Sequence, residues 1–243
     1  MKILFTNDDG IQSQGLLYLV KEFAKDHEVY VSAPMTQKSA CSASLSVHRS
    51  FCFEEIPVEG AKRAFAVDGT PVDCVKFAIT YFHLQPDVVI SGPNFGWNLG
   101  TDINYSGTVG AALEAGMMGY PAIAISCKAK AYCYDAAYEF LQGALDKLLQ
   151  KKMPYLVWNI NLPEVSSLRE TKGVILTSQG FYPYEYEYCR EEDGSFRLCG
   201  TGQENAMPCD VYYCKHGYIT VTPLSFDLTR YDVLREWTWE TLE

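Results

Sequence analysis

Positive charge is scarce in this sequence and nowhere concentrated. Among 243 residues, 20 lysines and arginines stand against 30 aspartates and glutamates, which gives a formal net charge of −10. Proteins that bind nucleic-acid polymers replace phosphate counterions with clustered basic side chains. The scarcity therefore argues against DNA or RNA as a partner, whereas a small anion held through a metal ion remains compatible with it.

Long apolar stretches, paired cysteine motifs and a leader pattern are missing as well. No apolar run approaches the roughly 18 residues of a membrane-spanning helix, so we expect no membrane partner. The nine cysteines are odd in number and form no C-x-x-C, and the N-terminus begins as a strand rather than as a basic and apolar signal region. These features indicate free thiols in a reducing compartment and predict a cytoplasmic location.

The composition is that of an ordinary globular protein, with 48% hydrophobic and 21% charged residues. Short apolar runs alternate with amphipathic stretches in the first two-thirds of the chain. Alternation of this kind predicts an α/β fold of the doubly wound, Rossmann-like type, a mostly parallel sheet with helices on both faces. Thr70 and Pro71 are expected to cap and open the second helix. The predicted strands cover 2–6, 28–33, 45–56, 62–67, 87–91, 122–126 and 155–160, and the predicted helices cover 16–23, 71–82, 108–118 and 135–150.

The pattern changes after about residue 165. We therefore divide the chain into an α/β catalytic core, 1–165, and a C-terminal extension, 166–243, which carries a β-hairpin arm and a terminal helix within the same structural domain. The expected elements of this extension are strands at 174–177, 181–188, 196–199 and 217–224 and a helix at 229–239.

Two carboxylates, Asp8 and Asp9, directly follow the first predicted strand. Adjacent carboxylates are costly to desolvate unless a positive charge lies between them, and oxygen ligands of this kind suit Mg²⁺, Mn²⁺ or Ca²⁺. The same residues also fit an Asx turn in which an aspartate caps the next helix. After the second strand, segment 36–46 contains Ser39 and three further serines, which fit either an oxygen ligand for a hard cation or an ordinary solvated loop.

A segment rich in glycine and asparagine, 91–107, follows a later strand. Its Asn94 and Asn98 offer neutral donors and acceptors, and its glycines let a ligand approach the backbone. Ser106-Gly107-Thr108 opens a helix, where free N–H groups attract an anion. A long turn with Ser106 as an ordinary cap is the alternative. Neither G-x-G-x-x-G nor G-x-x-x-x-G-K-[ST] is present, so dinucleotide and P-loop fingerprints are missing. Because ligands of open α/β sheets bind beyond the carboxyl ends of the strands, the three loops predict one site.

Several segments together resemble one protein family. The matching stretches are K-I-L-x-T-N-D-D-G from Lys2, Ser39, V-D-G-T-P-V-D-C from Val67, S-G-x-N-x-G-x-N-x-G from Ser91, Y-S-G-T-V-G-A-A-x-E-A-G from Tyr105, N-I-N-L-P from Asn159 and G-Y-I-T-V-T-P-L from Gly217. They are similar to the SurE family of metal-dependent survival-protein nucleotidases, from residue 1 to about residue 230. Two positions depart from the usual family pattern: Ala40 stands where glycine is usual, and Pro93 where an aliphatic residue is usual.

The resemblance implies a hydrolase that releases phosphate from nucleoside 5′-monophosphates, with 3′-monophosphates and short polyphosphate as further substrates. It implies one divalent metal ion, Mg²⁺ or Mn²⁺. Asp8 and Asp9 are then the catalytic pair: they hold the cation, which polarises a phosphoryl oxygen and lowers the pKa of a bound water. A covalent phospho-aspartate is a second mechanism, in which a carboxylate has to leave the metal. The implied metal ligands are Asp8, Asp9, Ser39 and Asn94, and the implied phosphate contacts are Asn98, Ser106, Gly107 and Thr108.

Two other function classes use the same loops. A non-catalytic sensor would bind nucleotide or metal without turnover. An NAD-dependent oxidoreductase would share the sheet topology, but the missing glycine fingerprint argues against it.

The arm contains an unusual number of tyrosines. Strand alternation places Tyr184, Tyr186 and Tyr188 on one face of segment 181–188, and aromatic faces on protruding hairpins are typical of subunit interfaces. The family resemblance adds the exchange of C-terminal elements between subunits. We therefore expect a homodimer or homotetramer formed through the arm, with a solvent-facing hairpin as the alternative.

Overall fold

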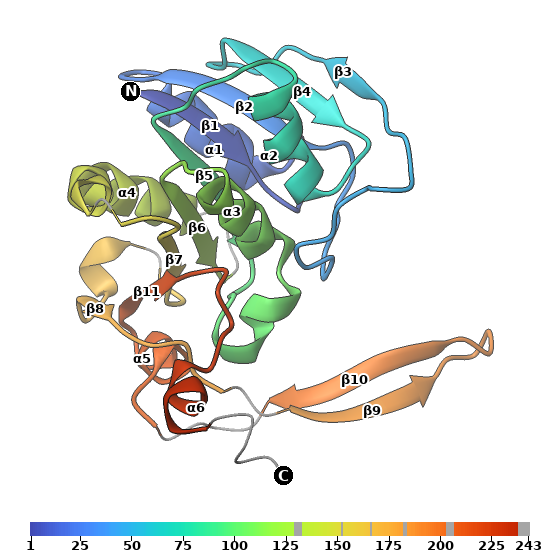
Figure 1. Ribbon diagram of the computed structural model, residues 1–243, viewed down its shortest axis with the longest axis vertical. Coiled ribbons are helices and arrows are strands. Elements are labelled where there is room, and N and C mark those ends of the chain that lie inside the picture. Colours follow the sequence, from blue (N-terminus) through green and yellow to red (C-terminus); the bar gives the residue numbers. More distant parts are fainter. Residues whose placement is uncertain (129–132, 152, 166, 182–183, 203–206, 238–243) are drawn as a thin grey trace.

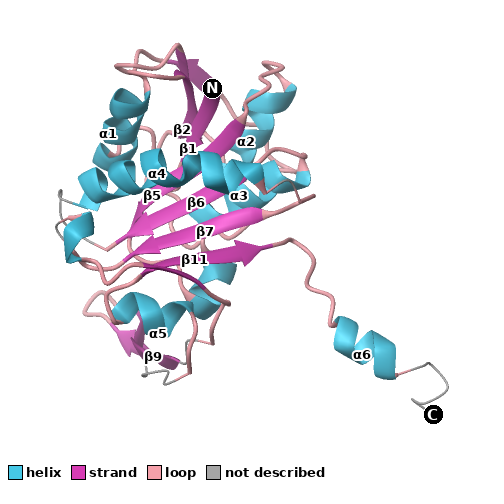
Figure 2. Ribbon diagram, turned by 90° about the vertical axis from the view of Figure 1, so that its left-hand side faces the viewer, coloured by secondary structure: helices cyan, strands magenta, loops and turns pink. Residues whose placement is uncertain are grey.

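The computed structural model of the chain describes all residues except 129–132, 152, 166, 182–183, 203–206 and 238–243 (Figure 1). Nine strands form its main sheet: β1 (Lys2–Thr6), β2 (Glu28–Pro34), β3 (Phe53–Glu55), β4 (Arg63–Val67), β5 (Val88–Phe95), β6 (Ala122–Cys127), β7 (Val157–Leu162), β8 (Val174–Leu176) and β11 (Ile219–Leu224). Their order across the sheet is β3-β4-β2-β1-β5-β6-β7-β11-β8. Figure 2 shows the central strands side by side. The predicted α/β fold class is confirmed.

The central six strands, from β4 to β7, are parallel. The outer strands β3 and β11 run antiparallel to their inner neighbours, and β8 runs parallel to β11. Strand β1 lies in the middle, with β2 on one side and β5 on the other. The chain therefore builds one half of the sheet outward from β1 and then returns to the other side of β1, which makes the boundary between β1 and β5 the topological switch point.

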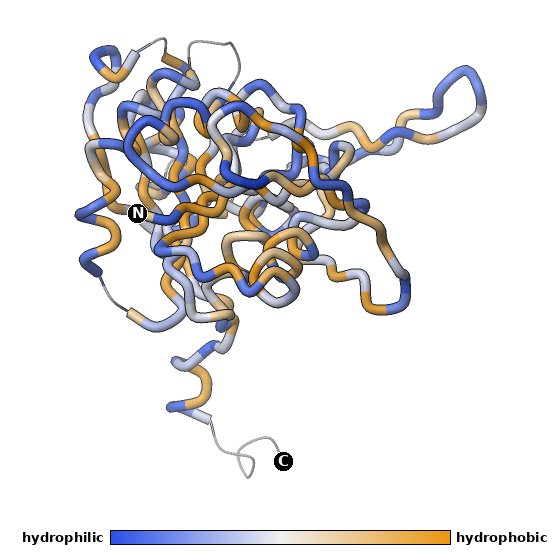
Figure 3. The backbone as a smooth tube through the Cα atoms, turned by 90° about the horizontal axis from the view of Figure 1, so that it is seen from above, coloured by the Kyte–Doolittle hydropathy of each residue, from blue (hydrophilic) through white to orange (hydrophobic). Residues whose placement is uncertain are grey.

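Four helices cover the two faces of the sheet: α1 (Gln14–Phe23), α2 (Pro71–Thr80), α3 (Gly107–Met117) and α4 (Cys133–Gln150). Ile3 and Phe5 of β1 belong to the same buried cluster as the apolar faces of α1 and α4. Leu4 points to the other face and packs with α2 and α3. A strand buried on both faces has an apolar run rather than an alternating pattern, and β1 does. Figure 3 shows that the hydrophobic segments gather inside the molecule.

The beginning of α2 has the predicted cap. The Thr70 side chain accepts a hydrogen bond from the Asp73 N–H at 3.1 Å, and the Asp73 carboxylate accepts one from the Thr70 N–H at 2.8 Å. Pro71 follows in the first turn, where its missing N–H costs nothing. This reciprocal pair satisfies two of the backbone donors that a helix start leaves unpaired.

Three features differ from the predicted elements. The strand predicted at 45–56 is reduced to β3, because Ser46 N–H binds the Asp73 side chain near the α2 cap instead of a strand neighbour. Strand β5 continues to Phe95, beyond its predicted end at 91, because Asn94 and Phe95 resume pairing with β6 after a shift in register. A short helix, α5 (Asp210–Lys215), forms where none was predicted.

The arm is a separate two-stranded sheet of β9 (Tyr184–Arg190) and β10 (Phe196–Gly202), which protrudes from the body (Figure 1). The last helix, α6 (Tyr231–Glu236), extends away from the sheet (Figure 2). The predicted segments 181–188 and 229–239 include residues outside the described part of the chain. The division at residue 165 stays a prediction, since β8 and β11 continue the main sheet beyond it. Among the helices that the structure describes, none is both long and apolar enough to cross a membrane.

Candidate active site

The candidate site lies at the switch point between β1 and β5, at the carboxyl ends of the parallel strands. Asp8 and Asp9 follow β1, Ser39 follows β2, and Asn94 lies near the end of β5. The first turn of α3 reaches the same place, because Thr108 contacts Asp8. The fold thus brings the three predicted loops together at the position where open α/β sheets bind ligands.

Asp8 is buried and held by the start of α3. Its Oδ1 accepts a hydrogen bond from the Thr108 hydroxyl at 2.6 Å, and its Oδ2 accepts one from the Thr108 backbone N–H at 3.2 Å. Its own carbonyl oxygen accepts from the Lys38 N–H at 2.7 Å, which draws the loop after β2 against β1. The helix start therefore fixes the carboxylate in one orientation.

Asp9 is half-buried and links the other two loops. Its Oδ2 accepts a hydrogen bond from the Phe95 N–H at 3.1 Å, on the residue after Asn94. The amide of Gln37 lies 3.4 Å from Asp9 Oδ1 and donates to Ser39 Oγ at 2.8 Å. Ser39 is therefore linked to the Asp9 carboxylate through the Gln37 amide, and Asn94 is linked to it through the next residue, Phe95.

The loop that carries Ser39 has an unusual backbone at the next residue. Ala40 has a φ of 55°, in the left-handed region that favours glycine. This is one of the two positions where the sequence departs from the usual family pattern. The Ser39 loop therefore makes a left-handed turn at Ala40 without the glycine that adopts it most easily.

Gly107, at the start of α3, is required by close packing. A Cβ atom there would lie 2.7 Å from Cys41 Sγ and 2.9 Å from Asp8 Cβ. Ser106 caps the helix, because its Oγ accepts a hydrogen bond from the Val109 N–H at 3.1 Å. The first N–H groups of a helix have no partner inside the helix, so this end presents donors beside the carboxylates.

Asn98 is fixed by a buried amide network that the sequence analysis did not assign. Its backbone N–H donates to Asn161 Oδ1 at 2.8 Å, and its carbonyl oxygen accepts from the side chains of Asn159 and Asn161. Its side-chain amide donates to Ser126 Oγ at 2.9 Å. The N-I-N alternation on β7 was the available signal, since it places both asparagines on one face of a strand. These contacts hold the segment between Asn94 and the start of α3.

Asp210 is a second residue that the sequence analysis missed. Its buried carboxylate accepts hydrogen bonds from the N–H groups of Gly100 and Gly180, both at 2.8 Å. It thereby joins the end of the asparagine-rich segment to the base of the C-terminal extension. No local signal in the sequence indicates this role, because the partner at Gly100 lies 110 positions away.

Burial and mutual repulsion act on the two carboxylates. Desolvation raises the pKa of Asp8 above its ordinary value of 3.8, the Thr108 hydroxyl opposes the shift, and the charge on Asp9 adds to it. Desolvation also raises the pKa of Asp9, and the hydrogen bond from the Phe95 N–H partly opposes this shift. Within the described residues, no lysine or arginine forms an ion pair with either group. Two ionised carboxylates here lack a positive partner.

This donor set fits a hard divalent cation. Carboxylate, amide and hydroxyl oxygens are the ligands that Mg²⁺ and Mn²⁺ prefer, and a cation would offset the desolvation of the two carboxylates. The Asn94 amide nitrogen donates to the Gly96 carbonyl at 2.9 Å, so its side-chain oxygen is the atom available to a metal. In the part of the chain that the structure describes, no group of three or more His, Cys, Asp or Glu side chains could hold a metal. A metal at this site would therefore need the neutral oxygens of Ser39 and Asn94 in addition to the two carboxylates.

The raised pKa of Asp8 gives a prediction for the metal-free protein. A carboxyl whose folded-state pKa exceeds its unfolded value contributes stability that is complete below the unfolded pKa and is lost as pH rises through the folded pKa. The side-chain amide of the Asp8→Asn variant does not titrate. We therefore expect the variant to gain stability relative to the natural chain as pH increases from about 4 to neutrality. Urea unfolding of both proteins in EDTA at several pH values measures this difference, and a constant difference would contradict the prediction.

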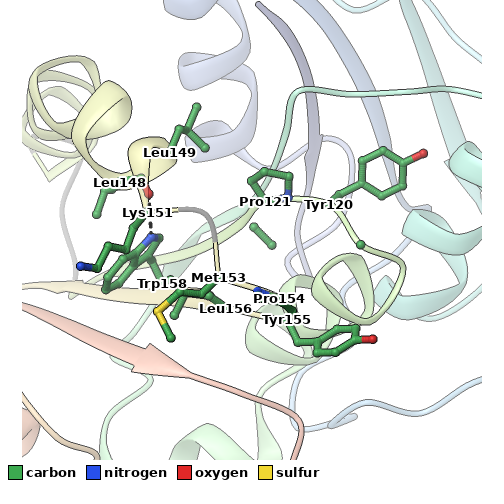
Figure 4. A pocket seen from close by; sticks show the side chains of 12 residues that line it. Tyr120, Pro121, Leu148, Leu149, Lys151, Met153, Pro154, Tyr155, Leu156 and Trp158 are labelled. Carbon is green, nitrogen blue, oxygen red and sulfur yellow. Dashed lines mark hydrogen bonds between the residues drawn. The ribbon is translucent and has the colours of Figure 1, made fainter.

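A hollow of about 520 Å³ lies at the opposite edge of the sheet, where β6 and β7 begin (Figure 4). Its wall includes Met153, Tyr155 and Trp158, and the Trp158 indole N–H donates to the Leu148 carbonyl at 3.2 Å. The described residues of this wall include no carboxylate. It therefore lacks the carboxylates that would hold a divalent metal, which lie at the carboxyl edge.

Comparison with known proteins identifies the family of this chain. The family model "Survival protein SurE" matches residues 3–186 of the chain. The chain belongs to the SurE family. The matched range contains all the predicted metal ligands and phosphate contacts, from Asp8 to Thr108, and the earlier resemblance is confirmed at the level of the family.

Relatives in the SurE family match over almost the whole length. The protein named 5′-nucleotidase SurE of Thermoanaerobacter sp. is 39% identical over 243 residues, with 96% of each chain covered. The protein of the same name from Clostridium beijerinckii is 39% identical, with 97% of each chain covered. The crystal structure of the SurE protein from Aquifex aeolicus superposes with a TM-score of 0.83 at 29% identity, covering 99% of this chain and all of that one.

Proposed function

We propose that this protein is a divalent-metal-dependent phosphomonoester hydrolase that releases phosphate from nucleoside 5′-monophosphates, with 3′-monophosphates and short polyphosphate as further substrates. One observation carries the proposal: two desolvated carboxylates lie without an ion-pair partner among the described residues, beside a helix N-terminus at the switch point of the sheet. The name of the relatives, 5′-nucleotidase SurE, supports the choice of substrate.

In this proposal Asp8 and Asp9 provide the negative charge that holds one Mg²⁺ or Mn²⁺, and Ser39 and Asn94 complete the ligand set with neutral oxygens. When bound, a divalent cation supplies positive charge to the phosphoryl group and acidifies a water molecule. Thr108 holds Asp8 in place through two hydrogen bonds. The ligand carboxylates are thus oriented before the substrate arrives.

The phosphate is proposed to bind at Asn98 and the start of α3. The Ser106 oxygen accepts the cap hydrogen bond, which leaves its hydroxyl proton for a phosphate oxygen, and the Gly107 N–H is one of the unpaired donors of the helix start. Both donors of Thr108 serve Asp8 in this structure, so its phosphate contact is through the field of the helix end. Donors of this kind stabilise the charge that builds on the phosphoryl oxygens.

The test is phosphate release from AMP and GMP in Mg²⁺ or Mn²⁺, measured with malachite green, before and after treatment with EDTA. We expect release that EDTA abolishes and that added metal restores. Nucleotide binding without release would instead support the non-catalytic sensor, and full activity in EDTA would remove the metal from the reaction. Hydride transfer between nicotinamide and substrate would support the oxidoreductase.

We also propose that the β9–β10 arm forms a homodimer or homotetramer. Tyr186 and Tyr188 are 56% and 71% exposed on one face of β9, and Leu198 is 52% exposed on the facing strand β10. A protruding strand pair with exposed apolar side chains needs a partner. We expect an oligomer in sedimentation at micromolar concentration and dissociation of a Tyr186→Lys, Tyr188→Lys double variant. A natural chain that sediments as a monomer would contradict the proposal.

The site of action is proposed to be the cytoplasm. The nine cysteines all lie in the described part of the chain and form no disulfide there, although some lie near each other in the arm and beside α4. Proteins that keep so many thiols reduced belong to reducing compartments.

A further inference from the structure

A smaller hollow, of about 380 Å³, adjoins the candidate site on the side of β6 and β7. Its lining includes Gly96 and Trp97 from the asparagine-rich segment, Lys128 after β6, Lys215 from α5 and Tyr184 from the arm. The volume falls within the roughly 300–1,000 Å³ of small-ligand sites. Two lysines and two aromatic rings meet here in a chain that is otherwise strongly acidic.

The hollow is directly connected to the metal ligands. The Asn94 side chain donates to the Gly96 carbonyl at 2.9 Å, and the Gly96 N–H donates to the Cys127 carbonyl at 2.9 Å. These contacts bring Lys128, the next residue after Cys127, beside the loop that holds Asn94. Trp97 lies three positions after Asn94, a reach of at most about 10 Å, which is the length scale of a nucleotide.

Trp97 is a fixed aromatic surface. Its indole N–H donates to the Leu162 carbonyl at 2.6 Å, and it packs against the buried cluster of Leu99 and Val211. The side chain is only half-buried. A ring that is held at one edge and still partly exposed suits stacking with a planar ligand.

Lys128 provides the polar side of the hollow. Its ammonium lies 4.7 Å from the centre of the Trp97 ring and 3.8 Å from the Glu164 carboxylate, and its side chain is half exposed. The ammonium lies over the face of the Trp97 ring, so a base stacks on that face when the lysine swings aside. Exposed contacts of both kinds contribute little, so the ammonium can turn toward a ligand at small cost. A lysine only donates hydrogen bonds, and it therefore favours ligands with carbonyl oxygens over ligands with amino groups at the same edge.

The acidic group in the hollow is engaged. The Tyr184 hydroxyl donates to Asp102 Oδ2 at 2.7 Å, across the wall of the hollow. This bond ties the base of the arm to the segment that precedes α3. Lys128 therefore determines which edge of a planar ligand is preferred.

We propose that this hollow holds the base of the nucleotide, with Trp97 as the stacking surface and Lys128 as the hydrogen-bond donor, and that it favours bases with carbonyl oxygens such as guanine and uracil. The inference rests on the proposed nucleotidase function, whose phosphate site it extends along the carboxyl edge of the sheet. The base site thus assigns substrate preference to two residues, Trp97 and Lys128, that are neither proposed metal ligands nor proposed phosphate contacts.

The experiment compares kcat/KM for GMP, AMP and ribose 5-phosphate, which carries the phosphate without a base, on the purified full-length enzyme. We expect GMP to exceed ribose 5-phosphate about tenfold or more, since one stacked base contributes on that order. Trp97→Ala should reduce this ratio about tenfold, mainly through KM, and Trp97→Phe should retain most of it. Lys128→Met should reduce the ratio of GMP to AMP about fivefold to tenfold, because a hydrogen bond from a charged group is lost.

Lys21→Met is the matched control, since Lys21 is also an exposed lysine paired with a glutamate, Glu59, but lies on α1 far from the hollow. It should leave every ratio unchanged. Equal hydrolysis of GMP and ribose 5-phosphate by the natural enzyme would overturn the base site while leaving the phosphohydrolase intact. An equal loss for both substrates in Trp97→Ala would also overturn it, because Trp97 would then support only the loop. Absence of hydrolysis for all three substrates would instead reject the proposed function.

Discussion

Asp9→Asn is expected to reduce phosphate release from AMP or GMP by at least about a hundredfold, and Asp8→Asn by at least as much, while both variants fold. Each substitution removes one of the two negative charges that are proposed to hold the cation. Asp8 has an additional effect, because both of its oxygens accept hydrogen bonds from Thr108, and an amide nitrogen in place of one oxygen would face a donor. Asp9 is therefore the cleaner test of charge alone.

The measurement combines phosphate release with thermal unfolding in the presence and absence of Mn²⁺. Added Mn²⁺ should raise the melting temperature of the natural chain and should have little effect on either variant, because a ligand stabilises only the state that binds it. Asp26→Asn, at an exposed aspartate after α1, is the control and should behave like the natural chain. Retention of full activity, or of the Mn²⁺-induced shift, in Asp9→Asn would reject the assigned metal site.

Gly92→Ala is expected to destabilise the protein strongly and to abolish activity. Gly92 has a φ of 120°, and a Cβ atom there would lie 2.2 Å from the carbonyl oxygen of Ile125 on the neighbouring strand. The substitution would push β5 away from β6 at the register shift that places Asn94. Because the overlap is with the backbone of a buried strand, no flexible side chain can move to relieve it. The displacement would therefore reach Asn94, the proposed metal ligand.

Gly173→Ala separates the two causes of this effect. Gly173 has a φ of 119°, nearly the same backbone conformation, but no atom lies within 4 Å of a Cβ built there. This control should lose about 1–2 kcal/mol from backbone strain alone. Gly92→Ala should lose at least about 2 kcal/mol more in urea unfolding, because overlap is added to strain. Similar losses in the two variants would show that overlap at Gly92 is relieved locally.

The elements that the sequence predicts well are those whose signals are local. Thr70 and Pro71 specify the start of α2 as predicted, and Asp73, which was not predicted to take part, completes the cap within the same four residues. The apolar run of β1 and the helical spacing after it likewise depend on near neighbours. Prediction was poorer where pairing is long-range, as in β5, whose last residues become strand only because β6 lies beside them.

The candidate site shows the same distinction. The types of its ligands and the loops that carry them follow from the sequence and the family resemblance. The partners that orient them do not, since Thr108 reaches Asp8 across 100 positions and Asn161 reaches Asn98 across 63. The roles of Asn159 and Asn161 become clear only when β7 lies beside β6.

The sequence by itself determined the α/β class, the order of strands and helices, and the presence of adjacent carboxylates after the first strand, because each is encoded by composition and spacing along the chain. The tertiary structure alone decided which groups meet and how they are held. Burial raises the pKa values of Asp8 and Asp9, Gly107 allows α3 to approach them, and Trp97 meets Lys128 beside the site. These properties arise from desolvation and close contact, which exist only after distant segments have packed together.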